Sequence, residues 1–377
     1  LPDSSVSACQ SAHNYLIIMN NLYGKIKSDK RAAWVAFALL GLLLAAVPFF
    51  ADSLGGRSWV RIIDFALLYI MLALGLNIVV GFAGLLDLGY IAFYAVGAYL
   101  YALLASPHFN LHLPFWALLP IGAGVAGLFG VILGAPTLRL RGDYLAIVTL
   151  GFGEIIRIFL NNLNAPINIT NGPQGVNGID PISLGSMSLA KTQSLAGISV
   201  PSLHQYYYLF LALTLVIIFI TLRLQDSRIG RAWVAIREDE VAAKAMGINT
   251  RNVKLLAFAM GASFGGVAGG LFAGFQGFVS PESFGLMESV MVLCMVVLGG
   301  MGHIPGVILG GILLATLPEL LRYIIVPIQQ YFFGKVLVDP ESVRMLIFGL
   351  ALIGVMLFRP AGLWPSPTRK RELAEEA

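Results

Sequence analysis

Long runs of apolar residues, separated by short polar or basic stretches, occupy most of this 377-residue chain. A helix needs about 20 mostly apolar residues to cross the hydrocarbon core of a bilayer. By this criterion the pattern predicts about ten spanning segments, at residues 32–50, 59–81, 85–105, 114–136, 143–163, 205–223, 254–276, 285–301, 305–327 and 341–358. We therefore expect an all-α integral membrane protein, a bundle of about ten transmembrane helices.

The composition agrees with this expectation. Hydrophobic residues make up 58% of the chain and charged residues only 12%, whereas an ordinary soluble domain is about 25% charged. The chain has too few polar side chains to cover a soluble surface, so its surface must face lipid. The net charge of +4 does not indicate a nucleic-acid partner, because the basic residues lie in short loops between apolar runs.

The distribution of lysine and arginine predicts the orientation. Cytoplasmic loops of membrane proteins carry an excess of these residues. With ten helices, four basic clusters fall on one side, although Arg57 and Arg61 lie on the other. The four clusters are Lys25 to Arg31, Arg139 with Arg141, Arg223 to Lys254, and Arg369 to Arg371. Both termini are therefore expected in the cytoplasm, with an N-terminal segment at 1–31, a transmembrane domain at 32–358 and a tail at 359–377.

Two loops are too long to be simple connections. The loop at 164–204 is expected outside and is rich in Asn, Gly, Pro and Ser. It is either a flexible surface loop or a docking or gating surface. The loop at 224–253 is expected in the cytoplasm, and residues 231–246 are rich in helix-forming residues.

The predicted cytoplasmic helix is amphipathic. Its apolar positions can share one face, with Gly247 as the C-terminal cap and Thr250 as the N-cap of the next helix. The apolar face comprises Val234, Val241, Ala245 and Met246. Such a helix lies either on the membrane surface or in a groove of a partner protein.

Three of the polar residues inside predicted spanning segments are candidates for a functional role. Glu154 is near the middle of segment 143–163, where an acidic group costs ~2.5–3.5 kcal/mol on insertion scales and needs a partner. Arg157, one helical turn further on, is the nearest candidate. The two form either a buried structural pair or a polar point on a translocation path. Asn77 can bond across helices or line a broken segment, since a glycine-rich link at 81–87 follows it.

Other motifs point to packing rather than to chemistry. Gly261, Gly265 and Gly269 recur every four residues, which lets a neighbouring helix approach closely. No GxxxxGK[ST] phosphate-binding loop occurs. The two cysteines, Cys9 and Cys294, are far apart, and the five histidines show no metal-ligand spacing. The sequence therefore indicates no cofactor and no metal site.

Residues 240–247 resemble the EAA loop of ABC importer permeases, in which Glu-Ala-Ala is followed after three residues by glycine. The register differs here, because Val241 occupies the family's glutamate position and Glu240 lies one residue early. In that family the loop is a coupling helix that docks on the ATPase subunit. The resemblance implies an ATPase-coupling loop that includes Arg237, Glu238, Glu240, Ala242, Ala243 and Gly247.

Further segments resemble one branch of this family, the permeases for branched-chain amino acids. The similarity covers roughly residues 60–365 and is especially close around Arg141-Gly142-Asp143-Tyr144. The segments that carry it are 75–81, 88–99, 139–157, 276–284 and 297–302. The resemblance is to the M-type permease, and the substrate class rests on this resemblance alone.

The resemblance also implies partners and a location. A permease of this type pairs with a second, homologous permease and with two ATP-binding-cassette ATPase subunits. It receives its substrate from a periplasmic amino-acid-binding protein, and it lies in lipid in the bacterial inner membrane. The chain itself is then not an enzyme.

Other functions stay open at this point. The chain resembles permeases whose superfamily also moves other small solutes, such as urea, amides or sugars. A stand-alone secondary transporter would need an inverted repeat and its own ion site, and Glu154 is the one candidate carboxylate deep in the bilayer. An intramembrane enzyme would need paired catalytic groups at membrane depth, and the sequence shows no such pair.

Overall fold

The computed structural model describes residues 30–109, 111–138, 140, 142–164, 168–184, 187–195 and 198–333. Beyond 333 it describes short stretches at 346, 349–350, 353–354, 357 and 362–364. The chain divides into two compact units, Leu1–Val60 and Arg61–Ala377. In the first unit α2 spans Lys30–Gly55, and α3, which spans Arg57–Asn77, begins there and continues into the second unit.

Helices make up most of the second unit. Seven helical stretches of the described residues are long and apolar enough to cross a membrane: Arg57–Phe82, Phe115–Thr137, Tyr144–Asn162, Ser202–Gln225, Thr250–Gln276, Pro281–Gly299 and Ile304–Tyr331. Its α-helices are α4 (Ile91–Leu104), α5 (Phe115–Thr137), α6 (Asp143–Asn162), α7 (Ser202–Gln225), α8 (Arg228–Glu238), α9 (Glu240–Ala245), α10 (Thr250–Gln276), α11 (Leu286–Gly299) and α12 (Ile304–Phe333). The structure is therefore that of a predominantly helical membrane protein.

The count of ten spanning helices stays a prediction. Segment 341–358 lies largely outside the described residues, and the apolar part of α2 at Gly41–Ser53 is short. The expected third segment at 85–105 differs more clearly, since its helix, α4, has 14 residues and begins only at Ile91.

The start of that segment is non-helical because its backbone groups have other partners. Gly84 takes a positive φ of 68°, a conformation that favours glycine. The backbone N–H of Gly89 donates to Asp87 Oδ1 at 2.9 Å, and the N–H of Leu88 donates to Thr149 Oγ1 at 3.1 Å. The glycine-rich link predicted at 81–87 is therefore helical at Gly81 and Phe82, and the chain is non-helical from 83 to 90.

The helix before this link changes its geometry as it ends. α3 continues into a π-helical turn, η1 (Ile78–Phe82), in which all five residues are buried. The N–H of Ala83 donates to the carbonyl of Ile78 at 3.2 Å, the i to i+5 pattern of a π-helix. Such turns occur often at functional sites.

α10 packs closely against three other helices, and its glycines make this possible. Gly261 lies against Gly75 of α3, while Gly265 lies against Tyr90 and Phe93 at the start of α4. Further along, Gly269 approaches the backbone of α4 at Tyr94 and Ala98, and Gly266 approaches Gly97 of α4 and Gly122 of α5. The three glycines selected from the sequence thus lie in these contacts, which join α10 to α3 and α4.

The loop at 164–204 is folded in its described residues, which form regular secondary structure. It contains a 3-10 turn, η2 (Gly172–Gln174), and two small hairpins, which are β2 (Ser183–Leu184) with β3 (Met187–Ser188) and β4 (Gln193–Leu195) with β5 (Ile198–Val200). β1 (Val176–Asn177) pairs with β6 (Phe278–Val279), which directly follows α10. The Thr170 hydroxyl donates to the carbonyl of Leu160 at 2.6 Å and so ties the loop to the end of α6.

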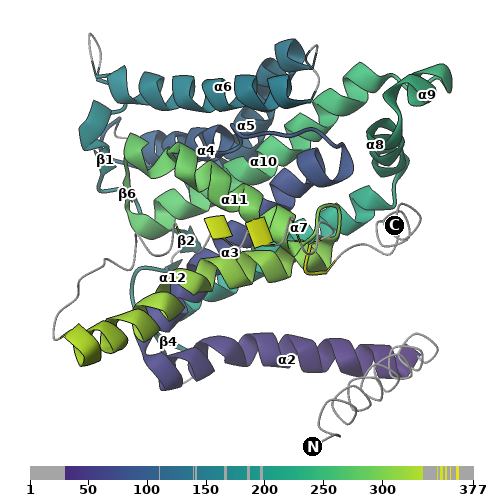
Figure 1. Cartoon of the computed structure of the whole chain (residues 1–377). Coiled ribbons are helices and arrows are strands. Elements are labelled where there is room, and N and C mark those ends of the chain that lie inside the picture. Colours follow the sequence, from purple (N-terminus) through teal and green to yellow (C-terminus); the bar gives the residue numbers. More distant parts are fainter. Residues whose placement is uncertain are drawn as a thin grey trace, which may run out of the picture. The chain divides into compact units, whose positions relative to one another are not determined.

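Figure 1 shows which elements lie at the two ends of the helix bundle in the second unit. α5, α6 and α10 run across the view, with α8 and α9 at the right and β1 and β6 at the left. The helices α8 and α9 and the folded loop therefore lie at opposite ends of the bundle.

Replacing Gly266 tests the importance of this close packing. A Cβ there would lie 2.5 Å from Ala126 Cβ and 2.7 Å from the Gly122 carbonyl oxygen, whereas a Cβ at Gly124 meets nothing within 4 Å. We expect Gly266→Ala to lower the free energy of unfolding by about 1–3 kcal/mol. The matched control, Gly124→Ala, should be neutral or slightly stabilising. Heating in detergent followed by size-exclusion chromatography measures both variants, and equal losses would contradict the packing argument.

Candidate functional site at the α8–α9 end

The segment between α7 and α10 forms two helices where the sequence suggested a single helix at 231–246. The break falls at Asp239, whose carboxylate accepts from the N–H groups of Val241 and Ala242 at 2.8 and 3.0 Å. Asp239 is therefore the N-cap of α9. An N-cap residue has a non-helical backbone conformation, so α8 has to end before it. Ser227 caps α8 in the same way, through Gly230 N–H at 3.2 Å.

One face of this helix pair is buried in the chain. Trp233 is fully buried, and its Nε1–H donates to the carbonyl of Val253 at the start of α10 at 2.7 Å. Ile236 is buried beside it, and so is Ala243, which is 4% exposed. The sequence places Ala243 in the loop expected to dock on the ATPase, but its side chain points into the protein and is not available to a partner.

The other face is apolar and exposed. Val234 is 45% exposed, Val241 68% and Met246 84%. Ala242 and Ala245 are exposed beside them. We refer to these five residues as the outer face of α8–α9. Exposed apolar residues grouped on a helix are typical of a surface that a partner protein or a membrane covers, and the four residues grouped from the sequence pattern are among them.

The end of α9 is fixed by Gly247. The N–H of Gly247 donates to the carbonyl of Lys244 and the N–H of Ile248 to that of Ala243, both at 3.1 Å. These two bonds make a Schellman motif, which needs a left-handed residue at the position of Gly247, and its φ is 86°. The N-cap of α10 is Asn249, which accepts from Asn252 N–H at 3.2 Å, rather than the predicted Thr250.

Arg237 connects the helix pair to the broken end of α3. Its Nη1 donates to the carbonyl of Gly81 in η1 at 2.5 Å. One turn earlier, Asn77 Oδ1 accepts from Gly302 N–H, in the turn between α11 and α12, at 2.8 Å. We call Asn77, Gly81, Arg237 and Gly302 the Arg237 junction. It joins α8, α3 and the α11–α12 turn, so a shift of α8 acts directly on the end of α3.

An ion pair braces the same region. Glu240 Oε2 and Lys254 Nζ lie 2.7 Å apart, and Lys254 is buried. Both border a cavity of about 280 Å³ between the link at 83–90, the α5–α6 connection and the helix pair. Glu238 is exposed. Of the residues selected from the sequence, Arg237, Glu240, Ala243 and Gly247 thus hold the loop in place, while Ala242 and Glu238 face outward.

Glu154 and Arg157 lie on α6, Glu154 near its middle and Arg157 one turn closer to the folded loop at 164–204. Arg157 Nε donates to both carboxylate oxygens of Glu154 at 3.1 Å, and Nη1 lies 3.2 Å from Glu282 Oε1. Glu282 belongs to η3 (Pro281–Phe284). The side chains of Arg157, Glu154 and Glu282 are 24%, 40% and 70% exposed. The predicted ion pair is therefore present, as part of a three-residue cluster that is partly open rather than enclosed in the bundle.

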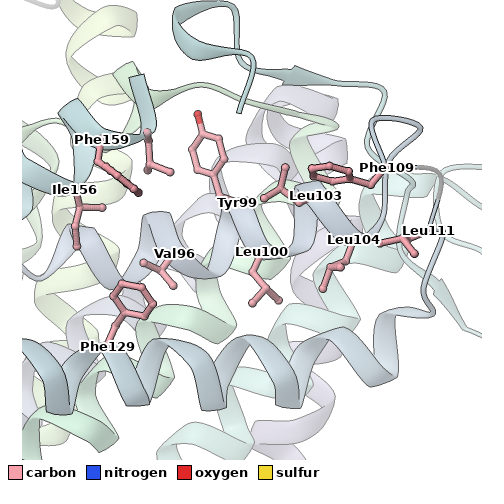
Figure 2. Close-up of a pocket in the computed structure, with 11 residues that line it drawn as sticks. Val96, Tyr99, Leu100, Leu103, Leu104, Phe109, Leu111, Phe129, Ile156 and Phe159 are labelled. Atoms are coloured by element: carbon pink, nitrogen blue, oxygen red, sulfur yellow. The ribbon is translucent and has the colours of Figure 1, made fainter. Parts of the chain in front are cut away.

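A separate cavity of about 550 Å³ lies between α4, α5 and α6 (Figure 2). Apolar side chains line almost all of it, including Val96, Leu100, Phe129 and Ile156. The hydroxyl of Tyr99 is its one polar side-chain group and has no hydrogen-bond partner among the described residues. A charged amino acid would leave its ammonium and carboxylate groups unpaired here, so the chemistry of this cavity suits an apolar chain instead.

Comparison with known families decides what kind of protein this is. The family described as the permease component of branched-chain amino acid transport systems matches residues 58–356. The chain belongs to this family.

Individual relatives agree with this assignment. The high-affinity branched-chain amino acid transport system permease protein LivM of Escherichia coli (strain K12) is 44% identical over 341 residues, which are 87% of this chain and 74% of LivM. BraD of Pseudomonas aeruginosa, with the same description, is 28% identical, and LivH of E. coli K12 is 27% identical. Each of these covers 79% of this chain and 92% of the relative. No solved structure matches.

Several structurally important residues of this branched-chain amino acid permease were not predicted from the sequence. Trp233 carries the inner contact of the helix pair, Gly302 completes the Arg237 junction, and Glu282 completes the charged cluster. The helical spacing of Gly230, Trp233 and Ile236 was a usable signal for a buried face. Gly302, the partner of Asn77, lies 225 residues away in the chain, and Glu282, the second partner of Arg157, lies 125 residues away. No local sequence pattern reveals partners at such distances.

Removing the guanidinium of Arg237 should loosen the end of α3. In this permease the N–H groups of Ala83 and Leu85 close the π-turn, through the carbonyls of Ile78 and Val79. We expect Arg237→Gln to speed hydrogen exchange at these two amides about tenfold or more, because losing a bond from a charged group costs ~1.5–3 kcal/mol. The control is Arg231→Gln, since the side-chain bond of Arg231 among the described residues stays within its own segment, to the Asp226 carbonyl at 2.8 Å. Exchange mass spectrometry with unchanged protection in Arg237→Gln would refute the connection.

Proposed function

We propose that this chain is the transmembrane permease subunit of an ATP-binding-cassette importer that moves branched-chain amino acids from the periplasm to the cytoplasm. The observation that carries the proposal is the 44% identity to LivM, a branched-chain amino acid transport permease, over 87% of the chain. The alternatives, a permease for another small solute or a stand-alone secondary transporter, find no support among the relatives.

A second permease is the first partner in this proposal. E. coli K12 has two permease proteins of the high-affinity branched-chain amino acid transport system, LivM and LivH, and this chain is similar to both. Two related permeases in one system favour a heterodimer in which the substrate crosses between the subunits. The present chain, being closer to LivM, takes the LivM position.

Two ATPase subunits are the second partner. The chain has no phosphate-binding loop, so ATP hydrolysis has to come from other chains. The outer face of α8–α9 is the proposed docking surface, because it is apolar, exposed and backed by a buried face that fixes its position. From this face the Arg237 junction leads directly to α3, which gives nucleotide-driven movement a route into the membrane domain.

The remaining parts of the proposal concern orientation. We place the protein in the bacterial inner membrane, with ten spanning helices, both termini and the loop 224–253 in the cytoplasm, and the loop 164–204 in the periplasm. The segment limits are those given above, 1–31, 32–358 and 359–377. The basic residues of loop 224–253 support this orientation. The folded hairpins of loop 164–204 offer a surface to a periplasmic amino-acid-binding protein.

Cysteine labelling tests the orientation. Thr192 is exposed in loop 164–204 and Met246 is exposed on α9. In a variant without Cys9 and Cys294, a membrane-impermeant thiol reagent should label Thr192→Cys in cells with a permeabilised outer membrane. Met246→Cys should react only after the inner membrane is opened. The reverse pattern would overturn the orientation.

Substitutions on the outer face test the coupling. We expect Ala242→Trp and Met246→Asp to abolish co-purification with the ATPase and to lower leucine uptake at least about tenfold, a change of ~1.4 kcal/mol. Both side chains point away from the protein, so membrane insertion should be normal. Uptake is measured with labelled leucine in a strain that lacks its native permease.

Two further variants make this test specific. Lys244→Gln, an exposed change beside the outer face, should retain ATPase binding and uptake. Ala243→Trp places a large ring in a buried position and should damage the permease itself, which lowers expression before any effect on coupling. Wild-type uptake and ATPase binding in both outer-face variants would rule out α8–α9 as the coupling element.

A further inference from the structure

The charged cluster of Glu154, Arg157 and Glu282 has an unusual location. Glu154 lies 11 residues after the start of α6, about 16 Å along a helix of about 30 Å. The face of α6 beside it is apolar and exposed, with Tyr144 72%, Ile147 64% and Ile155 59% exposed. Two charges of the cluster thus stand partly open near the middle of a spanning helix, and the third, Glu282 of η3, lies beside them. A surface of this kind is costly against lipid, so it has to face water or protein.

The charges are arranged unevenly. Arg157 donates hydrogen bonds from Nε and Nη2 to Glu154 and from Nη1 to Glu282. The contact with Glu282 is the weaker of the two, because it is a single bond of 3.2 Å to a side chain that is 70% exposed. The cluster carries one positive and two negative charges. It can therefore release Glu282 while Arg157 stays paired with Glu154.

The backbone that carries Glu282 is firmly held. Phe284 is buried, and its ring packs against those of Tyr94 and Tyr99 of α4, with centroids 5.3 and 6.0 Å apart. Pro281 is buried on the other side of Glu282. Only the flexible side chain of Glu282 is thus free to move. The hydroxyl of Tyr99, which lacks a hydrogen-bond partner among the described residues, lies on the α4 side chain that touches Phe284.

The cluster also lies near the folded loop. β6 immediately precedes η3 and pairs with β1 of loop 164–204, and Thr170 ties that loop to the end of α6. On the proposed orientation this is the periplasmic side. A substrate that enters from that side reaches this cluster before it reaches the Arg237 junction at the opposite end.

We propose that the Glu154–Arg157–Glu282 cluster is a binding site for the charged end of the amino acid on the wall of the translocation path. The α-carboxylate replaces Glu282 at Arg157 Nη1, and the released Glu282 carboxylate accepts from the α-ammonium group. Each charge of the zwitterion then has an opposite partner, and Glu154 holds the guanidinium in place throughout. This inference rests on the proposed function, and it adds a substrate site within the membrane domain.

Direct binding to the purified transporter tests the site. The sample is the permease pair with its ATPases, without nucleotide and without the binding protein, and the probe is labelled leucine. We expect saturable binding that unlabelled leucine displaces. Leucinol, which lacks the carboxylate, and 4-methylpentanoate, which lacks the ammonium group, should fail to displace it at the same concentration.

Variants separate a binding role from a structural one. Glu282→Gln removes one charge from an exposed side chain and should raise the dissociation constant for leucine at least tenfold, while the melting temperature stays unchanged. Glu282→Asp should recover part of the affinity. Arg157→Met should abolish binding but can also destabilise α6, so Glu282→Gln decides. Glu319→Gln on α12 is the matched control and should bind leucine normally.

Two results with the variants and the leucine analogues would overturn the proposal. One is unchanged affinity in Glu282→Gln, and the other is displacement by leucinol or 4-methylpentanoate as effective as by leucine. Absence of saturable binding to the wild-type complex also counts against it. If that same complex still imports leucine when the binding protein is added, only the site is refuted. If it imports no branched-chain amino acid at all, the proposed function fails as well.

Discussion

The structure depends on one constraint, a backbone carbonyl that has no hydrogen-bond partner within its own helix. α3 stops as a regular helix at Asn77, and the π-turn that follows leaves the carbonyl of Gly81 to be satisfied from outside the helix. A buried carbonyl without a partner is costly. The guanidinium of Arg237 supplies the bond, and it comes from α8 rather than from another part of the membrane domain. The need to satisfy this one group therefore joins the segment between α7 and α10 to the interior of the bundle.

The close helix packing around α10 makes such a connection effective. Glycines bring the backbones of α3, α4 and α5 within contact of α10, and tightly packed interiors transmit displacement instead of absorbing it. The Arg237 junction lies at the α8–α9 end of this packed bundle, and the Glu154–Arg157–Glu282 cluster lies between the middle of α6 and the folded loop.

Much of this arrangement could be read from the sequence, because it depends on local patterns. Apolar length identified the helices of the seven candidate spans among the described residues. The spacing of Gly261, Gly265 and Gly269 identified a packing face, and Glu154 with Arg157 follows from a separation of three residues. Features that depend on distant partners could not be read. Asn77 bonds to Gly302, and Glu282 completes the cluster on α6. The apolar pattern of 231–246 gave the exposed residues but not the inward direction of Ala243, since a helix that is apolar on two sides has no single inner face.

α10 is one continuous helix, and it connects the α8–α9 helix pair to the segment that bears Glu282. Trp233 and Glu240 attach the helix pair to its first turns, at Val253 and Lys254. Its 27 residues then run for about 40 Å without interruption. At the far end the chain passes through Gly277 into β6 and, two residues later, into the turn that bears Glu282. A continuous helix with one end beneath the proposed docking surface and the other beside a charged cluster can convert a small tilt at one end into a displacement at the other. Among the described residues, the side-chain bonds that attach the helix pair to this helix are one indole hydrogen bond and one ion pair.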